Sequence, residues 1–454
     1  MRAALLKAQA KKKKFQKRKV EVVKEEDSDA SLSSDDEEGY SENMIGKVLN
    51  KKYLVLKYLG RGTFSKVWLV LDIVQNDYVA LKVQEPDDLD EMNQEIKVLD
   101  TLKNNSRLGR KIEDFEVKVH GYHTHAMVME LLGDNIGNII GEIPLDIRLK
   151  TVKRLFREIV EGVEILHNNG VIHLDMKTDN ILLTELNPEI NNYINEIKEL
   201  DIAEYFEQQM KECLPKEMAL LDKKKRKMVK KKIRLRVLKE VGNHFFQDIN
   251  KINGESLTNL KLDIQELNPD EDIEDSISEN ESLNYNWESL HAKIIDLGNS
   301  IFEDEKDEED DQEVYTRSYR PPENIIHKVY STKSDIWFLG CLLYELLTEE
   351  ILFDIDVDSI DKNKRDKEHL RQMHQLLGHI PREMLHYHQL PDDVLEFNRF
   401  EMEDLSLREN LTNSFDIPED ELDLIEDLMF KILEYNPEER YSATDILNHK
   451  WFTT

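Results

Sequence analysis

The sequence predicts an α+β protein with two lobes, in which a sheet comes first and helices follow. Runs rich in β-branched, aromatic and aliphatic residues fill the region from Tyr53 to Leu132. Runs with apolar residues at helical spacing follow, most clearly from Leu149 to Asn168. A charged stretch, residues 185–291, then interrupts the helical part.

The elements of the first lobe come in a regular order. Two strands joined by a Gly-containing turn predict a hairpin, and a third strand, a helix and a buried strand follow. The predicted ranges are Tyr53–Gly60, Lys66–Leu71, Val79–Val83, Glu91–Leu102 and Ala126–Leu132. After the charged stretch, a strand at Ala292–Leu297 and helical patterns from Lys333 onward complete the second lobe.

Composition limits the classes of function. The 454 residues include 94 Asp and Glu against 62 Lys and Arg, and the net charge of −32 favours a basic partner over nucleic acid. The two cysteines, Cys213 and Cys341, have no metal-ligand spacing, which predicts a reducing compartment. No apolar run reaches membrane-spanning length, so we expect a soluble, intracellular protein without a membrane partner. The sequence does not determine the oligomeric state, although a monomer is the expectation.

A charged tail precedes the first lobe. Residues 1–39 hold a basic run, Lys11–Lys19, and then an acidic-serine run, Glu25–Glu38. Polar runs of one sign rarely pack, so this tail is predicted to be disordered. The basic run is either a nuclear localisation signal or simply a solvated tail.

The charged stretch 185–291 is predicted to be a spacer inserted into the second lobe. It holds a basic segment, Lys223–Lys239, and an acidic one, Asp263–Glu281, and we expect Ile190–Leu235 to be partly helical. Long charged stretches within a compact domain are usually surface excursions, so we expect a folded, active protein without it. The remaining boundaries are 40–132 for the first lobe and 133–184 with 292–454 for the second.

The turn Gly60-Arg61-Gly62-Thr63-Phe64-Ser65 is suited to phosphate. Glycine lets backbone amides approach phosphate oxygens closely, although a hairpin turn without a ligand has the same pattern. Lys82 follows in an apolar strand, where a buried ammonium needs a partner. Glu95 is the expected partner and Glu91, one turn earlier, is the second candidate; a lysine that reaches water from an edge strand is the alternative.

The strongest indication of function is the segment His173-Leu174-Asp175-Met176-Lys177-Thr178-Asp179-Asn180. Polar residues between apolar stretches indicate a rigid loop, and this one resembles the catalytic loop of eukaryotic protein kinases. The resemblance implies that Asp175 orients the attacking hydroxyl and accepts its proton. It implies that Lys177 offsets charge on the transferring phosphoryl group and that Asn180 ligates magnesium.

The strand end Ile294-Ile295-Asp296-Leu297-Gly298 matches the next kinase motif. By the same resemblance Asp296 binds the magnesium that bridges the phosphates, and removing 185–291 restores ordinary kinase spacing between Asp175 and Asp296. The implied cofactors are ATP and Mg²⁺, with Asn180 and Asp296 as metal ligands. The implied nucleotide-binding residues are Leu59, Gly60, Gly62, Ser65, Val67, Ala80, Lys82, Glu95, Met129, Glu130, Leu132, Asn180 and Asp296.

Two further motifs supply structural supports. Thr316-Arg317-Ser318-Tyr319-Arg320-Pro321-Pro322-Glu323 places Glu323 to pair with a late arginine, for which Arg440 is the candidate. Ser334-Asp335-Ile336-Trp337 places Asp335 to brace the catalytic loop through backbone hydrogen bonds. Five motifs in kinase order leave little room for another fold, so a two-lobed eukaryotic protein kinase fold is predicted.

Over residues 39–184 and 292–454 the chain resembles the SR-protein kinases. The match rests on the loop around Phe64-Ser65 with Val67-Trp68-Leu69, on the Leu before Asp175, on Asp296-Leu297-Gly298-Asn299, and on Leu376-Leu377-Gly378 followed by Ile380-Pro381. The resemblance implies phosphorylation of serines in Arg-Ser repeats of splicing factors. It also implies a divided kinase core whose insert influences distribution between cytoplasm and nucleus.

Two family features concern activation and substrate docking. Leu174 stands where many kinases carry an arginine that senses activation-segment phosphate, which implies activity without activating phosphorylation. Glu350 and Glu368 fall at acids of the docking groove for Arg-rich substrates, whereas Gln375 replaces another acid. The plain alternative for Glu350 and Glu368 is solvated surface.

Two other functions compete with this reading. One is a kinase related to the MAP, cyclin-dependent and Clk-like kinases, with a different basic or proline-flanked substrate. The Phe64-Ser65 loop and the insert favour an SR-protein kinase over this alternative. The other is a pseudokinase that only binds partners, against which the intact Lys82, Asp175 and Asp296 argue.

Overall fold

The structure is a computed structural model. The residues that it describes are 44–62, 65–85, 89–103, 105–119, 122–216, 218, 221–265, 285–305, 316–355, 362–385, 406–414 and 416–453. The predicted tail 1–39 and Phe64 of the glycine-containing turn lie outside these residues, as does most of the acidic segment Asp263–Glu281.

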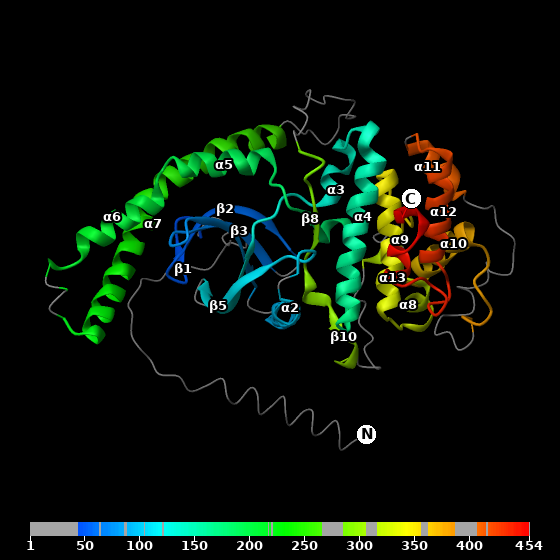
Figure 1. Cartoon of the computed structure of the whole chain (residues 1–454), viewed down its shortest axis with the longest axis horizontal. Helices are drawn as coiled ribbons and strands as arrows, with labels where there is room; N and C mark the ends of the chain where they lie inside the picture. The colour runs from blue at the N-terminus through cyan, green and yellow to red at the C-terminus, as the bar shows by residue number, and fades with distance from the viewer. Residues whose placement is uncertain are drawn as a thin grey trace, which may run out of the picture. The chain divides into compact units, whose positions relative to one another are not determined.

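The first lobe is built on one antiparallel sheet of six strands (Figure 1). Its spatial order is β1-β2-β3-β4-β6-β5, and every neighbouring pair runs antiparallel. The strands are β1 (Val48–Leu49), β2 (Tyr53–Arg61), β3 (Ser65–Asp72), β4 (Asp77–Gln84), β5 (Lys111–Val119) and β6 (Tyr122–Glu130). The predicted hairpin is β2–β3, and the predicted helix is α2 (Leu89–Thr101), so the sheet-first plan is confirmed.

The second lobe is mainly helical and surrounds α9, which is buried along almost its whole length. Ser331 and Ser334 form a capping box that starts α9, and the apolar residues that follow leave no polar face. The helices of this lobe are α3 (Ile136–Ile139), α4 (Leu145–Asn168), α8 (Pro322–His327), α9 (Thr332–Thr348), α10 (Lys362–Leu377), α11 (Leu407–Ser414), α12 (Glu419–Ile432), α13 (Ala443–Leu447) and α14 (Lys450–Thr453). In the part of the chain that the structure describes, no helix has both the length and the apolar character needed to cross a membrane.

Four short strands lie within the second lobe and form two antiparallel pairs. One pair joins β7 (Val171–Ile172) to β10 (Ile301–Phe302), and the other joins β8 (Ile181–Leu183) to β9 (Ala292–Ile294). Both pairs bring together segments that 185–291 separates in the sequence. They flank the loop that holds the predicted catalytic residues.

The structure differs from the predicted surface excursion over the first part of 185–291. Three helices, α5 (Pro188–Lys198), α6 (Ile202–Cys213) and α7 (Lys223–Gln265), pack on the β1–β2 side of the sheet, and we call them the insert helices (Figure 1). Their apolar side chains join those of β2 and β3 in a second hydrophobic cluster. Its buried members are Leu54, Leu56, Leu69, Leu71, Ile73, Tyr193, Ile194, Ile197, Ile202, Phe206, Val237, Leu238, Val241, Phe245 and Ile249.

This cluster corrects the expectation that the whole stretch is a removable spacer. The expectation that Ile190–Leu235 is partly helical is confirmed, but the many lysines and glutamates between the apolar residues hid the buried side of these helices. Backbone contacts are equally close, because a Cβ on Gly242 of α7 would lie 2.4 Å from the carbonyl oxygen of Gly46. The insert helices are therefore part of the packed first lobe.

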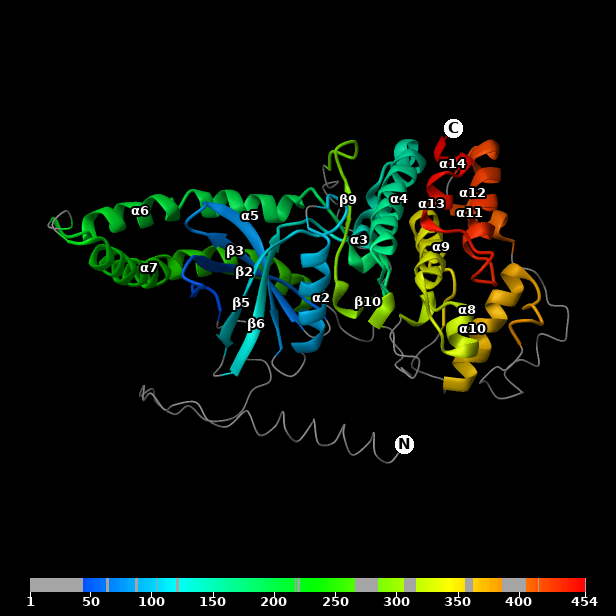
Figure 2. The ribbon, with the colours of Figure 1, turned by 60° about the horizontal axis from the view of Figure 1, so that its bottom comes forward.

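Strand pairing shows which face of the sheet the insert helices cover. Leu69 lies opposite Ala80 and Val67 lies opposite Lys82, and directly opposed side chains share a face. Leu71 is two residues from Leu69 and therefore shares that face as well. The insert helices thus bury the same face that carries Ala80 and Lys82. Helix α2 contacts the sheet at the other edge, at β5 and β6 (Figure 2).

Candidate active site

The β8–β9 pair brings the predicted catalytic loop next to Asp296. Ile181 lies opposite Ile294 in this pair, and the backbone N–H of Ile295 donates to the carbonyl oxygen of Asn180 at 2.9 Å. Asn180 and Asp296 are consequently neighbours although the insert separates them in the sequence. Asp296 has a φ of +60°, a left-handed conformation that is rare for residues with a side chain and common at functional sites.

Lys82 connects the sheet to this loop. Its Nζ lies 2.7 Å from Oε2 of Glu95 on α2 and 2.8 Å from Oδ1 of Asp296. Glu95 is only 1% exposed, so its carboxylate needs this cation. The predicted Lys82–Glu95 ion pair is confirmed, and Asp296 joins it as a second carboxylate.

Burial and charge act in opposite directions on these three groups. Burial lowers the pKa of Lys82, but the carboxylates of Glu95 and Asp296 outweigh it and raise the pKa above its ordinary value. Burial raises the pKa of Glu95, and Lys82 opposes this effect only in part. For Asp296 burial is outweighed by Lys82, and its pKa is lowered. Lys82 therefore keeps its proton and its positive charge. Asp296 loses its proton more readily than Glu95 does.

We expect Lys82→Met to reduce turnover by roughly 10²–10³-fold while the protein stays folded. The reason is the loss of a charge directed at the reacting phosphates, a type of stabilisation with an effect of that order. Glu95 can take up a proton once its partner is gone, because burial already raises its pKa. Steady-state kinetics and a melting curve would test this, with Lys103→Met, at an exposed position just after α2, as a control that should change neither. A folded Lys82→Met variant with near-normal turnover would contradict the role of Lys82.

Asp175 is held in one orientation by its neighbours. Thr316 Oγ1 donates to Asp175 Oδ1 at 2.8 Å, and Lys177 Nζ lies 3.3 Å from Asp175 Oδ2. The amide of Asn180 donates to the carbonyl oxygen of Asp175 at 2.7 Å. Thr316 was not predicted as a site residue, although its place at the start of the motif that ends in Glu323 was a signal for it. A carboxylate fixed in this way suits alignment of a hydroxyl group and acceptance of its proton.

Asp335 braces the catalytic loop as predicted. Its Oδ2 accepts from the backbone N–H of His173 at 2.8 Å, and its Oδ1 accepts from that of Leu174 at 2.9 Å. Leu174 has a φ of +69°, so these bonds hold a backbone conformation that a leucine would otherwise avoid. His167 adds a third contact to Asp335 at 2.9 Å.

The predicted glycine-containing turn joins β2 to β3. Gly60 lies opposite Val67, and the N–H of Gly62 donates to the carbonyl oxygen of Ser65 at 2.8 Å. A Cβ on Gly62 would lie 3.0 Å from Ser65 Oγ, so the small residues at both positions permit the close turn. Leu59, the residue before Gly60, packs against the cluster of the insert helices.

The predicted residues of the sheet lie in register. Val67 faces Lys82 across β3–β4, and Ala80 faces Met129 across β4–β6. Glu130, at the end of β6, uses its carboxylate to bind Lys293 Nζ at 2.5 Å. Leu132, in the connection to the second lobe, is partly buried. Val67, Ala80 and Lys82 thus share one face, as predicted for residues around one nucleotide.

The oxygen donors of Asn180 and Asp296 fit a magnesium ion. Mg²⁺ prefers oxygen ligands and is usually held by one or two protein side chains together with substrate phosphates. The Asp296 side chain is 39% exposed even though Lys82 contacts one of its oxygens. Among the described residues, no group of three or more His, Cys, Asp or Glu could hold a metal ion.

The predicted Glu323–Arg440 pair is confirmed as a buried bidentate contact. Arg440 Nη1 and Nη2 lie 2.8 and 3.0 Å from the two carboxylate oxygens of Glu323. Arg440 also donates to the carbonyl oxygens of Lys333, Glu434 and Tyr435. These contacts hold the segment of Thr316 and Glu323 against the start of α9.

A protein-family comparison agrees with this geometry. Residues 53–214 and 280–452 match the model described as "Protein kinase domain". The chain belongs to the protein kinase family. The first matched segment includes α5 and α6, and the match then resumes before Tyr285.

Comparison with curated relatives places the chain in a narrower group of protein kinases. The serine/threonine-protein kinase SRPK of Physarum polycephalum is 26% identical over 91% of this chain and 88% of its own length. SRSF protein kinase 3 of Mus musculus is 26% identical over 92% of this chain and 91% of its own length. The dual specificity protein kinase CLK1 of Mus musculus is also 26% identical, over 92% and 69% respectively. The chain is a serine/threonine protein kinase of the SRPK and CLK group.

The predicted docking acids of this kinase have different surroundings. Glu350 follows the end of α9 and is exposed. Glu368 on α10 is bound by Arg371, whose Nε and Nη2 lie 2.8 and 2.5 Å from its two oxygens, and this contact lowers the pKa of Glu368. Arg371 also donates to Gln375 at 2.9 Å. A cation of the kinase itself thus already occupies the Glu368 carboxylate.

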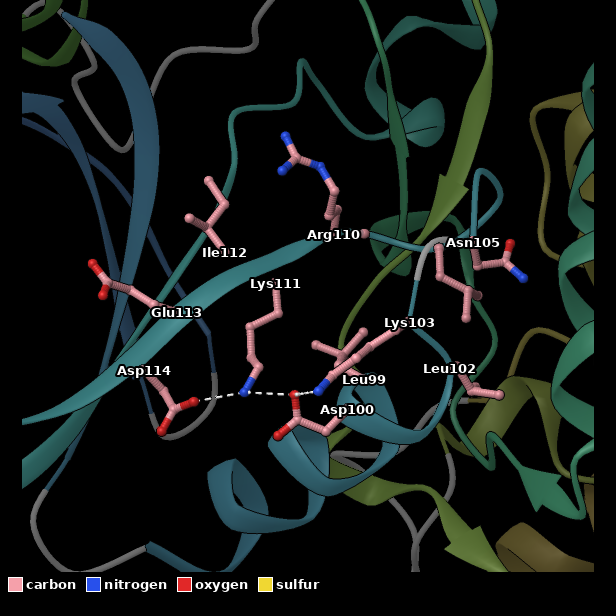
Figure 3. A pocket seen from close by; sticks show the side chains of 12 residues that line it. Leu99, Asp100, Leu102, Lys103, Asn105, Arg110, Lys111, Ile112, Glu113 and Asp114 are labelled. Carbon is pink, nitrogen blue, oxygen red and sulfur yellow. Dashed lines mark hydrogen bonds and ion pairs between the residues drawn. The ribbon is translucent and has the colours of Figure 1, made fainter. Parts of the chain in front are cut away.

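A separate cavity of about 490 Å³ lies between the end of α2 and the start of β5 (Figure 3). Lys111 lies at its centre, with Nζ 2.6 Å from Asp114 and 3.0 Å from Asp100 (Figure 3). Lys103 is 3.6 Å from Asp100. Glu113 and Arg110 of the lining pair instead with Lys52 and Glu130 outside it, and none of the predicted catalytic residues contributes to the cavity.

Proposed function

We propose that this kinase transfers the γ-phosphoryl group of ATP to serine hydroxyls in Arg-rich proteins, such as those with Arg-Ser repeats. One observation carries the chemical part: Asp175, held by Thr316 and Lys177, lies at the end of the β8–β9 pair, where Lys82 and Asp296 also meet. The substrate class is supported by relatives named SRPK and SRSF protein kinases and by the net charge of −32.

In the proposed reaction, the serine oxygen attacks the γ-phosphorus and forms a new P–O bond. The bond from the γ-phosphorus to the β–γ bridging oxygen breaks, and ADP leaves. Asp175 aligns the hydroxyl and takes its proton, while Lys177 offsets charge on the transferring group. Lys82 holds the α- and β-phosphates. A magnesium ion held by Asn180 and Asp296 would neutralise phosphate charge.

The same proposal covers activation and distribution in the cell. Leu174 is fully buried in the apolar core of the second lobe, so this position offers no cation to a phosphate on the activation segment. We therefore infer activity without activating phosphorylation. Distribution between cytoplasm and nucleus follows from the family resemblance alone.

A second substrate class is favoured by one observation, the equal identity to CLK1. Rates on Arg-Ser, Ser-Pro and acidic peptides, measured side by side, separate the alternatives. The proposal requires the highest kcat/KM on the Arg-Ser peptide. A preference for Ser-Pro or acidic peptides would reject it and leave the kinase assignment intact.

Docking of long Arg-rich substrates gives a prediction about Glu350 and Glu368. Exposed charge pairs contribute about 1 kcal/mol or less each, so one substitution should have little effect. We expect Glu350→Lys with Glu368→Lys to raise KM for a long Arg-Ser substrate roughly tenfold or more at low salt. The effect should shrink as salt rises, because the Debye length falls to ~8 Å at physiological ionic strength. KM for a short peptide that cannot reach these residues should stay unchanged.

Arg371 provides the matched control for this prediction. Arg371→Gln removes the cation that pairs with Glu368, so it should lower KM for the long substrate. Because both side chains of that pair are about one-third exposed, a substrate arginine can exchange for Arg371 in the wild type. If the double Lys variant binds the long substrate as the wild type does at low salt, docking through these acids is rejected.

A further inference from the structure

Strand β2 contains a bulge just before the glycine-containing turn. Val55 lies opposite Val70 and Lys57 lies opposite Leu69, which leaves Leu56 without a partner on β3. A bulge bends its strand and leaves one residue outside the ladder, so the direction of the strand beyond it depends on what holds that residue. Here the strand beyond the bulge leads to Gly60 and Gly62 through a second register shift at Leu59.

Two buried side chains of the insert helices bind the carbonyl oxygen of Leu56. Tyr193 Oη on α5 donates to it at 3.0 Å, and Asn253 Nδ2 on α7 donates at 2.8 Å. Tyr193 is 4% and Asn253 6% exposed. Burial raises the pKa of Tyr193, so its hydroxyl keeps the proton that it donates. Both donors come from outside the sheet, and both act on Leu56, the first of the two β2 residues that the ladder leaves out.

Neighbouring contacts direct the insert helices to the same place. Lys57, the next residue of β2, lies 2.7 Å from Glu189 of α5 and 5.0 Å from the ring centre of Tyr193. Leu59, at a second register shift of β2, packs against the cluster of the insert helices. Leu56, Lys57 and Leu59, which lead to the glycine-containing turn, therefore all contact these helices.

The segment between β6 and α3, which joins the two lobes, is tied to the insert as well. Asp134, just beyond β6, accepts hydrogen bonds from Asn187 at 2.8 Å and from Tyr285 at 2.7 Å. Asn187 lies just before α5, and Tyr285 lies after the described end of α7. A Cβ on Gly133 would lie 1.8 Å from the carbonyl oxygen of Glu185, so only glycine permits this approach. The insert is thus bound both to the segment that joins the two lobes and to β2.

We propose that Tyr193 and Asn253 are positioning residues for the nucleotide, which hold the bulge at Leu56 and thereby fix the turn Gly60–Gly62 over the phosphates. This inference rests on the proposed use of ATP. Hydrophobic burial by the insert helices explains why they stay attached to the sheet, but it does not require two directed donors on one carbonyl. The hydrogen bonds to Leu56 fix the direction in which the strand continues, because hydrogen bonds are directional and hydrophobic burial is not.

The test uses the full chain with Tyr193→Phe, Asn253→Leu and both together. Affinity for a fluorescent ATP analogue and KM for ATP should weaken roughly two- to fivefold in each single variant and about tenfold in the double variant. Both kcat at saturating ATP and KM for the peptide should stay within twofold of wild type, because Asp175 and Lys177 lie on other elements. Asn253→Gln keeps the amide donor and should recover part of the ATP affinity.

Tyr205→Phe is the matched control. Tyr205 stacks on His244 at 4.5 Å within the insert helices, so loss of its hydroxyl should leave ATP affinity unchanged. A double variant with a lower Tm but wild-type ATP affinity would show a purely structural role and overturn the inference. If the double variant does not fold, unchanged ATP affinity in Tyr193→Phe overturns it. If wild type itself fails to bind ATP, the proposed function falls and takes this inference with it.

Discussion

Asp175→Asn should lower phosphoryl transfer roughly 10³-fold or more while ATP still binds in a magnesium-dependent way. The asparagine keeps the shape of the side chain and its contact with Thr316, but it cannot accept the hydroxyl proton. Asp296→Ala should lower transfer as strongly for a different reason. It removes a magnesium ligand and one of the two carboxylates that hold Lys82, so nucleotide binding should lose its dependence on magnesium.

The measurement is ATP affinity with and without magnesium, beside turnover, for both variants. Asp179→Asn is the matched control, because Asp179 is an exposed carboxylate in the same loop and should tolerate the change. Identical nucleotide-binding profiles for Asp175→Asn and Asp296→Ala would mean that the two roles are wrongly assigned. Near-normal turnover in either variant would remove that residue from the mechanism.

Local patterns, together with the kinase resemblance, were enough to predict which residues of the proposed catalytic centre lie close together. Asp175, Lys177 and Asn180 lie within one short loop, so their spacing in the sequence already fixes their proximity. Lys82 was predictable because an ammonium in an apolar strand needs a carboxylate, and Glu95 at helical spacing could supply it. The contact of Lys82 with Asp296 could not be read in this way, because the β8–β9 pair closes only after the insert.

Charge density hid the structural role of the insert. Its apolar residues, such as Phe206 and Val241, lie on one side of the insert helices, whereas lysines and glutamates dominate the composition. Average polarity therefore predicted an excursion, although the helical spacing was present. The bulge at Leu56 left no sequence signal at all, since a leucine within an apolar strand looks like any other core residue.

The docking acids show a signal that was present but not used. Glu368 and Arg371 are three residues apart, and such residues are neighbours on a helix surface. That spacing alone could have shown that Glu368 is paired within the kinase. Glu350 follows the end of α9 and has no such spacing to a basic residue, which makes it the more accessible of the two predicted acids.

Removal of residues 185–291 should yield an insoluble or unfolded product, contrary to the expectation from the sequence. The deletion would expose the apolar side chains of β2 and β3 that the insert helices bury, which are Leu54, Leu56, Leu69, Leu71 and Ile73. Each such side chain contributes about 1.5–3 kcal/mol when buried, and whole domains are stable by only about 5–15 kcal/mol. The loss is therefore comparable to the total stability of the kinase.

A single substitution tests the same point without a deletion. Val241→Asp places a carboxylate in the cluster between α7 and the sheet, where the valine is fully buried, and should destabilise the protein by roughly 3 kcal/mol or more. Asn243→Asp adds the same charge to an exposed position two residues away and should leave Tm near that of wild type. Soluble yield, size-exclusion profile and Tm give the comparison. Two results would show that the first lobe does not need the insert helices: equal Tm values for Val241→Asp and Asn243→Asp, or a deletion product that is soluble and active. In either case the packing of the insert helices would contribute nothing to stability, and so it could not be what holds the sheet.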